Sequence, residues 1–152
     1  MINRFFALFD GTGNDTLSRP DELKLAAAAL LIEAASMDGD FDETEHRKIA
    51  ELLKRRFALA DEETEMLIKE AVAAVAKTGQ LYGFTRVVKD RYEMGERIEM
   101  IEMLWEVAFA DGQVDHFESN LIRRIGGLLF VTDLDRGLAK QRVMARLAVG
   151  SN

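Results

Sequence analysis

An internal repeat constrains the fold of this chain more than any other feature. Residues 31–45 read LIEAASMDGDFDETE and residues 104–118 read LWEVAFADGQVDHFE, so a glutamate, an aspartate–glycine pair, an aspartate and a second glutamate recur in the same order. The match extends over residues 31–53 and 104–126. Self-similarity at one fixed offset indicates a duplicated helix-loop-helix unit. We expect the two copies to bury their apolar faces against each other around a pseudo-twofold axis.

Helical spacing of apolar residues runs along the chain between and around the repeats. Ile49, Leu52, Leu53 and Phe57 fall on one side of a helix, whereas strand signals are scarce and the chain has one proline. The sequence therefore predicts an all-α fold, a compact bundle of about seven helices with short connections. It predicts a single domain over residues 1–152, with repeat halves at about 21–78 and 94–149 and a connector helix at about 81–92.

Capping residues and glycines mark the expected helix ends. Asp61 and Asp133 are predicted to cap two helices in the second part of each half. Gly126 and Gly127 lie inside a predicted helix, where each glycine costs about 1 kcal/mol relative to alanine. We expect this pair to mark close helix packing or an early helix end.

The twin pattern resembles a known family. In each copy a helix ends in Met or Ala followed by Asp-Gly, and a glutamate follows after five further residues. This pattern resembles the tellurite-resistance TerB-like family of bacterial all-helical domains, over about residues 23–146. The resemblance implies a duplicated helical fold, an interaction module acting in bacterial stress or tellurite resistance, and a site for a divalent cation.

The candidate cation ligands are the carboxylates of the repeated motif. They are Glu33, Asp38, Asp40, Asp42 and Glu45 in the first copy and Glu106, Asp111, Asp115 and Glu118 in the second. Oxygen ligands favour calcium or magnesium over softer metals. The first loop is the better candidate because Asp40 stands where the second has Gln113. An EF-hand is excluded, because its glycine and glutamate positions hold Glu43 and Ile49.

Structural roles explain part of the same motif without a metal. Asp42 and Glu45 have the spacing of a capping box at a helix start. The corresponding pair in the second copy, Asp115 and Glu118, has the same spacing. Capping leaves Glu33 and Glu106 unexplained, because both lie within apolar runs. Each needs either an arginine from a neighbouring helix or a shared cation. A metal-free protein–protein scaffold or homodimerisation domain is therefore the alternative to cation binding.

Composition narrows the function classes. The chain has no cysteine, which removes thiolate chemistry, and no phosphate-binding glycine loop, nucleophile elbow or metal-histidine helix motif is present. We therefore expect a protein without enzymatic activity and without catalytic residues. The less favoured alternative is a carboxylate-dependent hydrolase. The net charge of −7 argues against nucleic acid. Residues 120–152 carry net +4 and the remainder −11, an asymmetry that suits an unidentified protein partner or a homo-oligomer.

The sequence also favours a cytoplasmic protein. The absence of cysteine suits a reducing compartment, and the longest strongly apolar run, residues 25–32, is far shorter than the ~20 residues that span a bilayer. We therefore expect no integral membrane segment. The opening residues 1–9, MINRFFALF, predict an added helix that covers the core or, alternatively, a weak contact with a membrane or partner.

Overall fold

The computed structural model describes residues 19–36, 42–78, 81–110 and 116–150. Within these ranges the chain forms helices and no strands, which confirms the predicted all-α fold. The helices are α2 (Arg19–Ala35), α3 (Glu43–Phe57), α4 (Asp61–Thr78), α5 (Leu81–Arg91), α6 (Met94–Ala108), α7 (His116–Leu128) and α8 (Asp133–Gly150). The prediction for residues 1–9 falls outside the described part of the chain.

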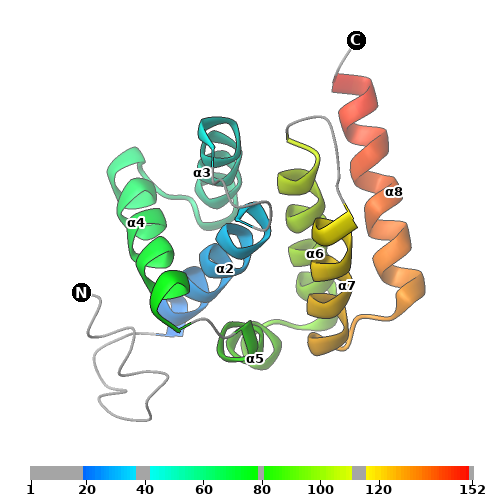
Figure 1. Ribbon diagram of the computed structural model, residues 1–152, viewed down its shortest axis with the longest axis horizontal. Coiled ribbons are helices and arrows are strands. Elements are labelled where there is room, and N and C mark those ends of the chain that lie inside the picture. The colour runs from blue at the N-terminus through cyan, green and yellow to red at the C-terminus, as the bar shows by residue number, and fades with distance from the viewer. Residues whose placement is uncertain (1–18, 37–41, 79–80, 111–115, 151–152) are drawn as a thin grey trace.

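Helix α2 is the centre of the bundle because it is apolar on nearly every side. Its residues 25–32 are all buried, and the helix contacts α3, α4, α5, α6 and α7. A helix that is hydrophobic all round is stable only when other elements cover it. Figure 1 shows α2 between α4 and α6, with α3 above and α5 below. None of the described helices, α2 included, combines the length and the apolar character needed to cross a membrane.

The helices form two groups of three in the same order. Helices α2, α3 and α4 lie on one side, α6, α7 and α8 lie on the other, and α5 lies between them at the base (Figure 1). Helix α2 packs against α4 as α6 packs against α8. Helix α3 also contacts α6, and α7 contacts α2, so the second helix of each group touches the first helix of the other. Two halves that arose by duplication and packed against each other would show such reciprocal contacts. The duplication itself stays a prediction.

The turns after α3 and α7 have the same backbone geometry. Ala58 and Phe130, near the two helix ends, adopt φ of 53° and 58°, in the left-handed region. In each turn the amide of the next residue donates to the carbonyl five residues back, at 3.2 Å after α3 and 2.9 Å after α7. This helix-ending motif usually places glycine at the left-handed position. Both turns instead carry a side chain there, at a cost of about 1–2 kcal/mol.

The two predicted caps, Asp61 and Asp133, are one residue out of place. Both are the first residues of their helices, α4 and α8. The residue before α8 is Thr132, whose hydroxyl oxygen accepts a hydrogen bond from the amide of Asp135 at 3.1 Å. An alanine precedes α4. The two aspartates lie in the first helical turn, where a carboxylate interacts favourably with the helix dipole without acting as the cap.

The glycine pair lies at the end of α7, close to its last residue, Leu128. Gly126 is buried, and a Cβ atom there would lie 3.5 Å from the side chain of Arg136, an ordinary contact. Gly127 is exposed, and a Cβ atom there would meet nothing within 4 Å. The helix end accounts for the position of the pair, and only Gly126 faces neighbouring side chains.

Candidate functional site

The structure describes four of the nine predicted ligand side chains, those of Glu33, Asp42, Glu45 and Glu106. The remaining five are not described: Asp38, Asp40, Asp111 and Asp115 lie outside the described residues, and Glu118 lies in α7 without a described side chain. Among the side chains that are described, no group of three acidic or histidine residues is placed to hold a metal ion.

Asp42 and Glu45 form the predicted capping box at the start of α3. The amide of Glu45 donates to the carboxylate of Asp42 at 2.8 Å, and the amide of Asp42 donates to the carboxylate of Glu45 at 3.3 Å. Each side chain thereby satisfies a backbone amide that the first turn of a helix leaves without a partner. The capping role accounts for both residues without a cation.

Glu106 is held by arginines from two neighbouring helices. Its side chain on α6 is only 8% exposed, and its two carboxylate oxygens lie 3.5 Å from Arg146 of α8 and 3.7 Å from Arg55 of α3. A buried carboxylate needs such partners because burial penalises its charged form. The sequence left two possible partners for Glu106, an arginine from a neighbouring helix or a shared cation. The structure places two arginines beside it.

Glu102 extends the same set of charges along α6. One of its oxygens accepts a hydrogen bond from Arg146 at 2.7 Å, and the other lies 3.1 Å from Arg142. The hydrogen bond to Glu102 raises the pKa of Arg146 above its ordinary value. Glutamates and arginines four residues apart share one face of their helices, so the charges alternate between α6 and α8. We call Arg142, Glu102, Arg146, Glu106 and Arg55 the charge ladder.

The charge ladder borders a groove between α3, α6 and α8. The groove has a volume of about 620 Å³ and is lined by Leu52, Arg55, Arg56, Glu99, Glu102, Met103, Glu106, Arg146 and Leu147. We call it the α3–α6–α8 groove. Its apolar residues come from all three helices, and its charged residues include both signs. Leu52 and Met103 are buried in the core, so the accessible lining is mainly charged, and arginine is enriched at protein interaction surfaces.

Arg56 fixes one wall of this groove. Its Nε atom donates to the hydroxyl of Tyr92 at 3.1 Å, its guanidinium lies 5.0 Å from the centre of that ring, and another nitrogen lies 3.3 Å from Glu96. Burial raises the pKa of Tyr92, and its hydrogen bond with Arg56 acts in the opposite direction. Arg56 is thus committed to the segment that joins α5 to α6, whereas Arg55 points to the groove with a side chain that is 63% exposed.

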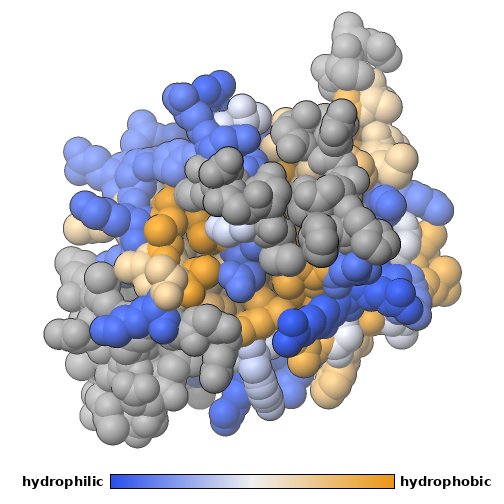
Figure 2. All heavy atoms as spheres, viewed as in Figure 1, coloured by the Kyte–Doolittle hydropathy of each residue, from blue (hydrophilic) through white to orange (hydrophobic). Residues whose placement is uncertain are grey.

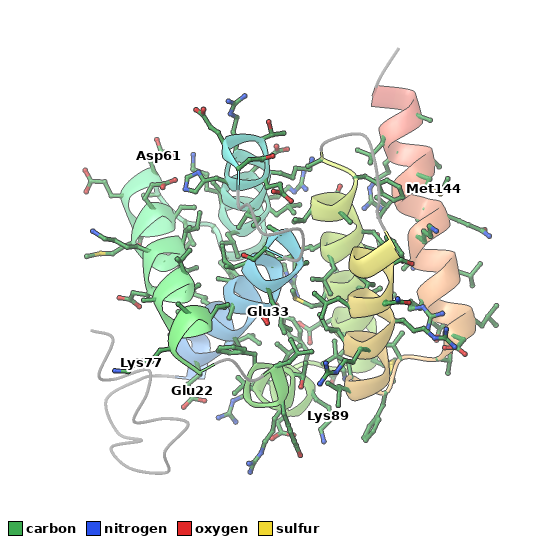
Figure 3. The ribbon with its side chains drawn as sticks, in the orientation of Figure 1. Glu22, Glu33, Asp61, Lys77, Lys89 and Met144 are labelled. Carbon is green, nitrogen blue, oxygen red and sulfur yellow. The ribbon has the colours of Figure 1, made fainter. Side chains whose placement is uncertain are left out.

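Glu33 differs from Glu106, the residue at the corresponding place in the repeat. It lies near the end of α2, in the middle of the molecule (Figure 3). Within the described residues its carboxylate makes no hydrogen bond or ion pair. Burial raises the pKa of Glu33, and the charge of Arg124 on α7 lowers it by a smaller amount. Of the four described candidates, Glu33 is the one without a hydrogen bond or ion pair to another described residue.

Sequence reasoning missed Arg55, Glu102 and Arg146, the residues that complete the ladder around Glu106. The signal was present: Glu102 and Glu106 are four residues apart, as are Arg142 and Arg146. Two such pairs of opposite charge on two helices can align when the helices pack side by side. The sequence alone does not show that α6 and α8 are neighbours, so the alignment becomes visible only in the fold.

The comparison with protein families found one match. The family model described as Tellurite resistance protein TerB covers residues 24–141, well over half of the chain. No match was found among curated proteins or among solved structures. The chain therefore belongs to the tellurite resistance protein TerB family, as the repeated acidic motif indicated.

Proposed function

We propose that this member of the TerB family is a non-enzymatic interaction module that holds a protein partner in the α3–α6–α8 groove. The observation that carries the proposal is the groove itself, a recess between three helices in which partly exposed arginines lie beside Leu147. The partner chemistry that fits is a segment with a carboxylate for Arg55 and an apolar side chain for Leu147, which is only partly buried. Arginine is enriched at interfaces because its planar group binds carboxylates through two parallel hydrogen bonds.

Arg55 is the cation of the groove that is most available to a partner. Its pairing with Glu106 is long, at 3.7 Å, and is its one ion pair within the described residues. A guanidinium has five N–H donors, so most of those of Arg55 remain for a second carboxylate. Arg146, by contrast, is already shared between Glu102 and Glu106. A carboxylate on the partner would therefore bind first at Arg55.

Two matched peptides test the proposal. Both place leucines on one face of a helix, and they differ only in carrying aspartate or lysine beside them. We expect the wild-type chain to prefer the aspartate peptide, and Arg55→Glu to reverse the preference, with about a tenfold loss of affinity for that peptide. Arg47→Glu is the matched control, because Arg47 is an exposed arginine of the same helix outside the groove.

Two results would overturn the groove proposal. One is a wild-type chain that binds both peptides equally. The other is Arg55→Glu and Arg47→Glu changing binding to the same extent, because that outcome would assign the preference to the overall charge of α3 and not to the groove. Far-ultraviolet circular dichroism of each variant shows that the helices remain folded.

A second candidate function, binding of a divalent cation at the first acidic loop, is favoured by Glu33 alone. A half-buried carboxylate near the end of a helix, where the helix dipole favours a cation, is a suitable anchor for calcium or magnesium. In this proposal Asp38 and Asp40 supply the further oxygens. Cation at 100 times its dissociation constant should stabilise the chain by about 2.7 kcal/mol. Thermal melting with calcium, magnesium and a chelator measures the gain.

Glu33→Gln separates the cation proposal from the groove proposal. It should abolish any cation-dependent rise in melting temperature and leave peptide binding in the groove unchanged. An unchanged melting temperature of the wild-type chain at every cation concentration would exclude the cation. We further propose that the module acts in the cytoplasm in a tellurite-resistance or related stress response. The family description and the cysteine-free composition support that setting.

A further inference from the structure

The outward side of α8 is an unusually apolar helix surface. Leu134, Gly137, Leu138, Gln141, Met144 and Ala145 recur at helical spacing and carry no charge, and we call them the α8 outer face. The side chains of Leu134, Leu138 and Met144 are 70%, 40% and 50% exposed. Figure 2 shows patches of hydrophobic colour, interrupted by hydrophilic residues, along the right edge of the molecule, where Figure 1 places α8. The opposite side of α8, with Ala139 and Val143, is buried.

Helix α4 provides an internal comparison for this face. It packs against α2 as α8 packs against α6, and it begins at Asp61 where α8 begins at Asp133. At the positions that correspond to Leu134, Gly137 and Gln141, α4 carries charged side chains. They are Glu62, Glu65 and Lys69, whereas the remaining three positions hold the apolar residues Met66, Val72 and Ala73. The fold therefore does not require an uncharged outer face at this place in a half, and the apolar face of α8 calls for another explanation.

Phe130 is a further exposed apolar residue near α8, and it stands at a backbone position that disfavours a bulky side chain. It stands just before α8, at the left-handed position that Ala58 holds in the first half. Its side chain is 65% exposed, and the ammonium group of Lys89 lies 4.9 Å from the ring centre. A bulky residue at positive φ is uncommon and costs free energy. An exposed aromatic ring at this cost extends the apolar surface at the N-terminal end of α8.

We infer that the α8 outer face binds a second copy of this chain, with the two α8 helices antiparallel. The charges of α8 are self-complementary in that arrangement. Asp133 and Asp135 lie in its first turn, and its remaining charged residues, Arg136, Lys140, Arg142 and Arg146, are all basic. Antiparallel pairing sets the acidic first turn of each helix beside basic residues in the middle of the other, and it also opposes the two helix dipoles favourably. The inference does not depend on the groove proposal.

The register of the pair follows from two charged residues. Asp135 and Arg142 are seven residues apart, so they share one flank of the helix beside the apolar face. When the pair is centred near Leu138, Asp135 of each copy lies opposite Arg142 of the other. Arg142 also pairs with Glu102 of its own chain, yet its side chain stays 48% exposed. In this register residues 133–144 of the two helices lie side by side, a contact about 18 Å long.

A lipid surface is a poorer occupant of the same face. Membranes that attract peripheral proteins are commonly anionic, and basic residues supply the attraction. Helix α8 has more basic than acidic residues, but its two acidic residues, Asp133 and Asp135, flank Leu134, which is 70% exposed. Repulsion of these carboxylates from an anionic surface would oppose binding, whereas the same carboxylates are matched by arginine in the antiparallel pair.

Mass measurement and cross-linking test the inference on the full chain. Light scattering after size exclusion should give twice the 17.1 kDa mass for the wild type. Leu138→Lys should return the mass to that of one chain, whereas Met66→Lys, the corresponding exposed position of α4, should leave it doubled. Because the chain has no cysteine, Leu138→Cys should form a disulfide-linked dimer on mild oxidation, and Met66→Cys should not.

Several outcomes would overturn the dimer. They are a single-chain mass for the wild type at high micromolar concentration, a doubled mass in Leu138→Lys, or equal cross-linking of the two cysteine variants. Binding of single chains to phosphatidylserine vesicles, lost in Leu138→Lys, would assign the face to lipid instead. Leu134→Glu, which installs the residue type of α4, should also give the single-chain mass, so the test survives if one variant fails to fold.

Discussion

Glu106 of α6 and Arg146 of α8 face each other across two packed helices, with 3.5 Å between carboxylate and guanidinium. This pairing joins the third helix of the second half to its first helix. Because Glu106 also lies 3.7 Å from Arg55, the same carboxylate connects α3 of the first half to α6 and α8 of the second. A residue of the repeated acidic motif thus acts here as a link between helices at the edge of a groove.

Glu106→Gln should lower the free energy of unfolding by about 1 kcal/mol. The substitution keeps the shape of the side chain but removes the charge that two arginines share, and the partial exposure of both arginines limits the loss. Urea unfolding followed by circular dichroism measures the change. Glu99→Gln, at an exposed residue of the same helix, is the control and should stay within about 0.5 kcal/mol of wild type. Equal effects of the two variants would contradict the linking role.

The sequence was sufficient to predict the fold class and the capping box at the start of α3. Residues 25–32 are apolar on successive positions, and only burial at the centre of a bundle accommodates such a helix. The capping box of Asp42 and Glu45 was predictable because it depends on residues three apart in one helix start. Local spacing determines such features, so no knowledge of the neighbouring helices was needed.

The groove could not be predicted in the same way, because its residues come from helices far apart in sequence. Arg55 and Arg146 meet at Glu106 only when α3, α6 and α8 are in place. The sequence therefore gave two possible partners for Glu106, an arginine or a cation, without a means of choosing. The predicted caps at Asp61 and Asp133 were each misplaced by one residue. Before α8, threonine and aspartate stand side by side and both are good caps, so the sequence does not decide between them. Before α4, the cap position holds an alanine, which is a poor cap and gives no signal in the sequence.

Glu33 should make stability depend on pH. Burial raises its folded-state pKa above the ordinary value, so its contribution to stability is fully present below the unfolded-state pKa and is lost as pH rises through the folded-state pKa. Glu33→Gln stays neutral throughout. We therefore expect the variant to gain stability relative to wild type as pH rises from about 4 to about 7. Chemical unfolding across this range, without divalent cations, measures the difference, and a difference that stays constant or shrinks would contradict the prediction.

Ala58→Gly should stabilise the chain by about 0.5–1 kcal/mol. The left-handed φ of 53° costs an alanine about 1–2 kcal/mol, and the greater freedom of glycine in the unfolded chain returns part of that gain. Thermal melting measures the effect. Ala76→Gly, at an exposed helical position of α4 without a left-handed φ, serves as control and should lose up to about 1 kcal/mol. A loss of stability in Ala58→Gly would show that the turn tolerates its side chain without strain.

Gly127→Ala should also stabilise the chain, by up to about 1 kcal/mol. The residue is helical and exposed, and an added Cβ atom meets no neighbour within 4 Å, so only the poor helix propensity of glycine changes. Gly126→Ala, where the new methyl group contacts Arg136, should gain less. Urea unfolding of both variants gives the comparison, and a larger gain at position 126 would be inconsistent with this packing.

Backbone amide chemical shifts during titration with the aspartate-bearing peptide test most directly whether the α3–α6–α8 groove is the binding surface. Shifts should change at the groove residues of α3, α6 and α8, from Leu52 to Arg56, from Glu99 to Glu106, and at Arg146 and Leu147. The same titration of Arg55→Glu should leave them in place. Changes confined to α4 or α5, or no change at saturating peptide, would contradict the groove as the site of interaction.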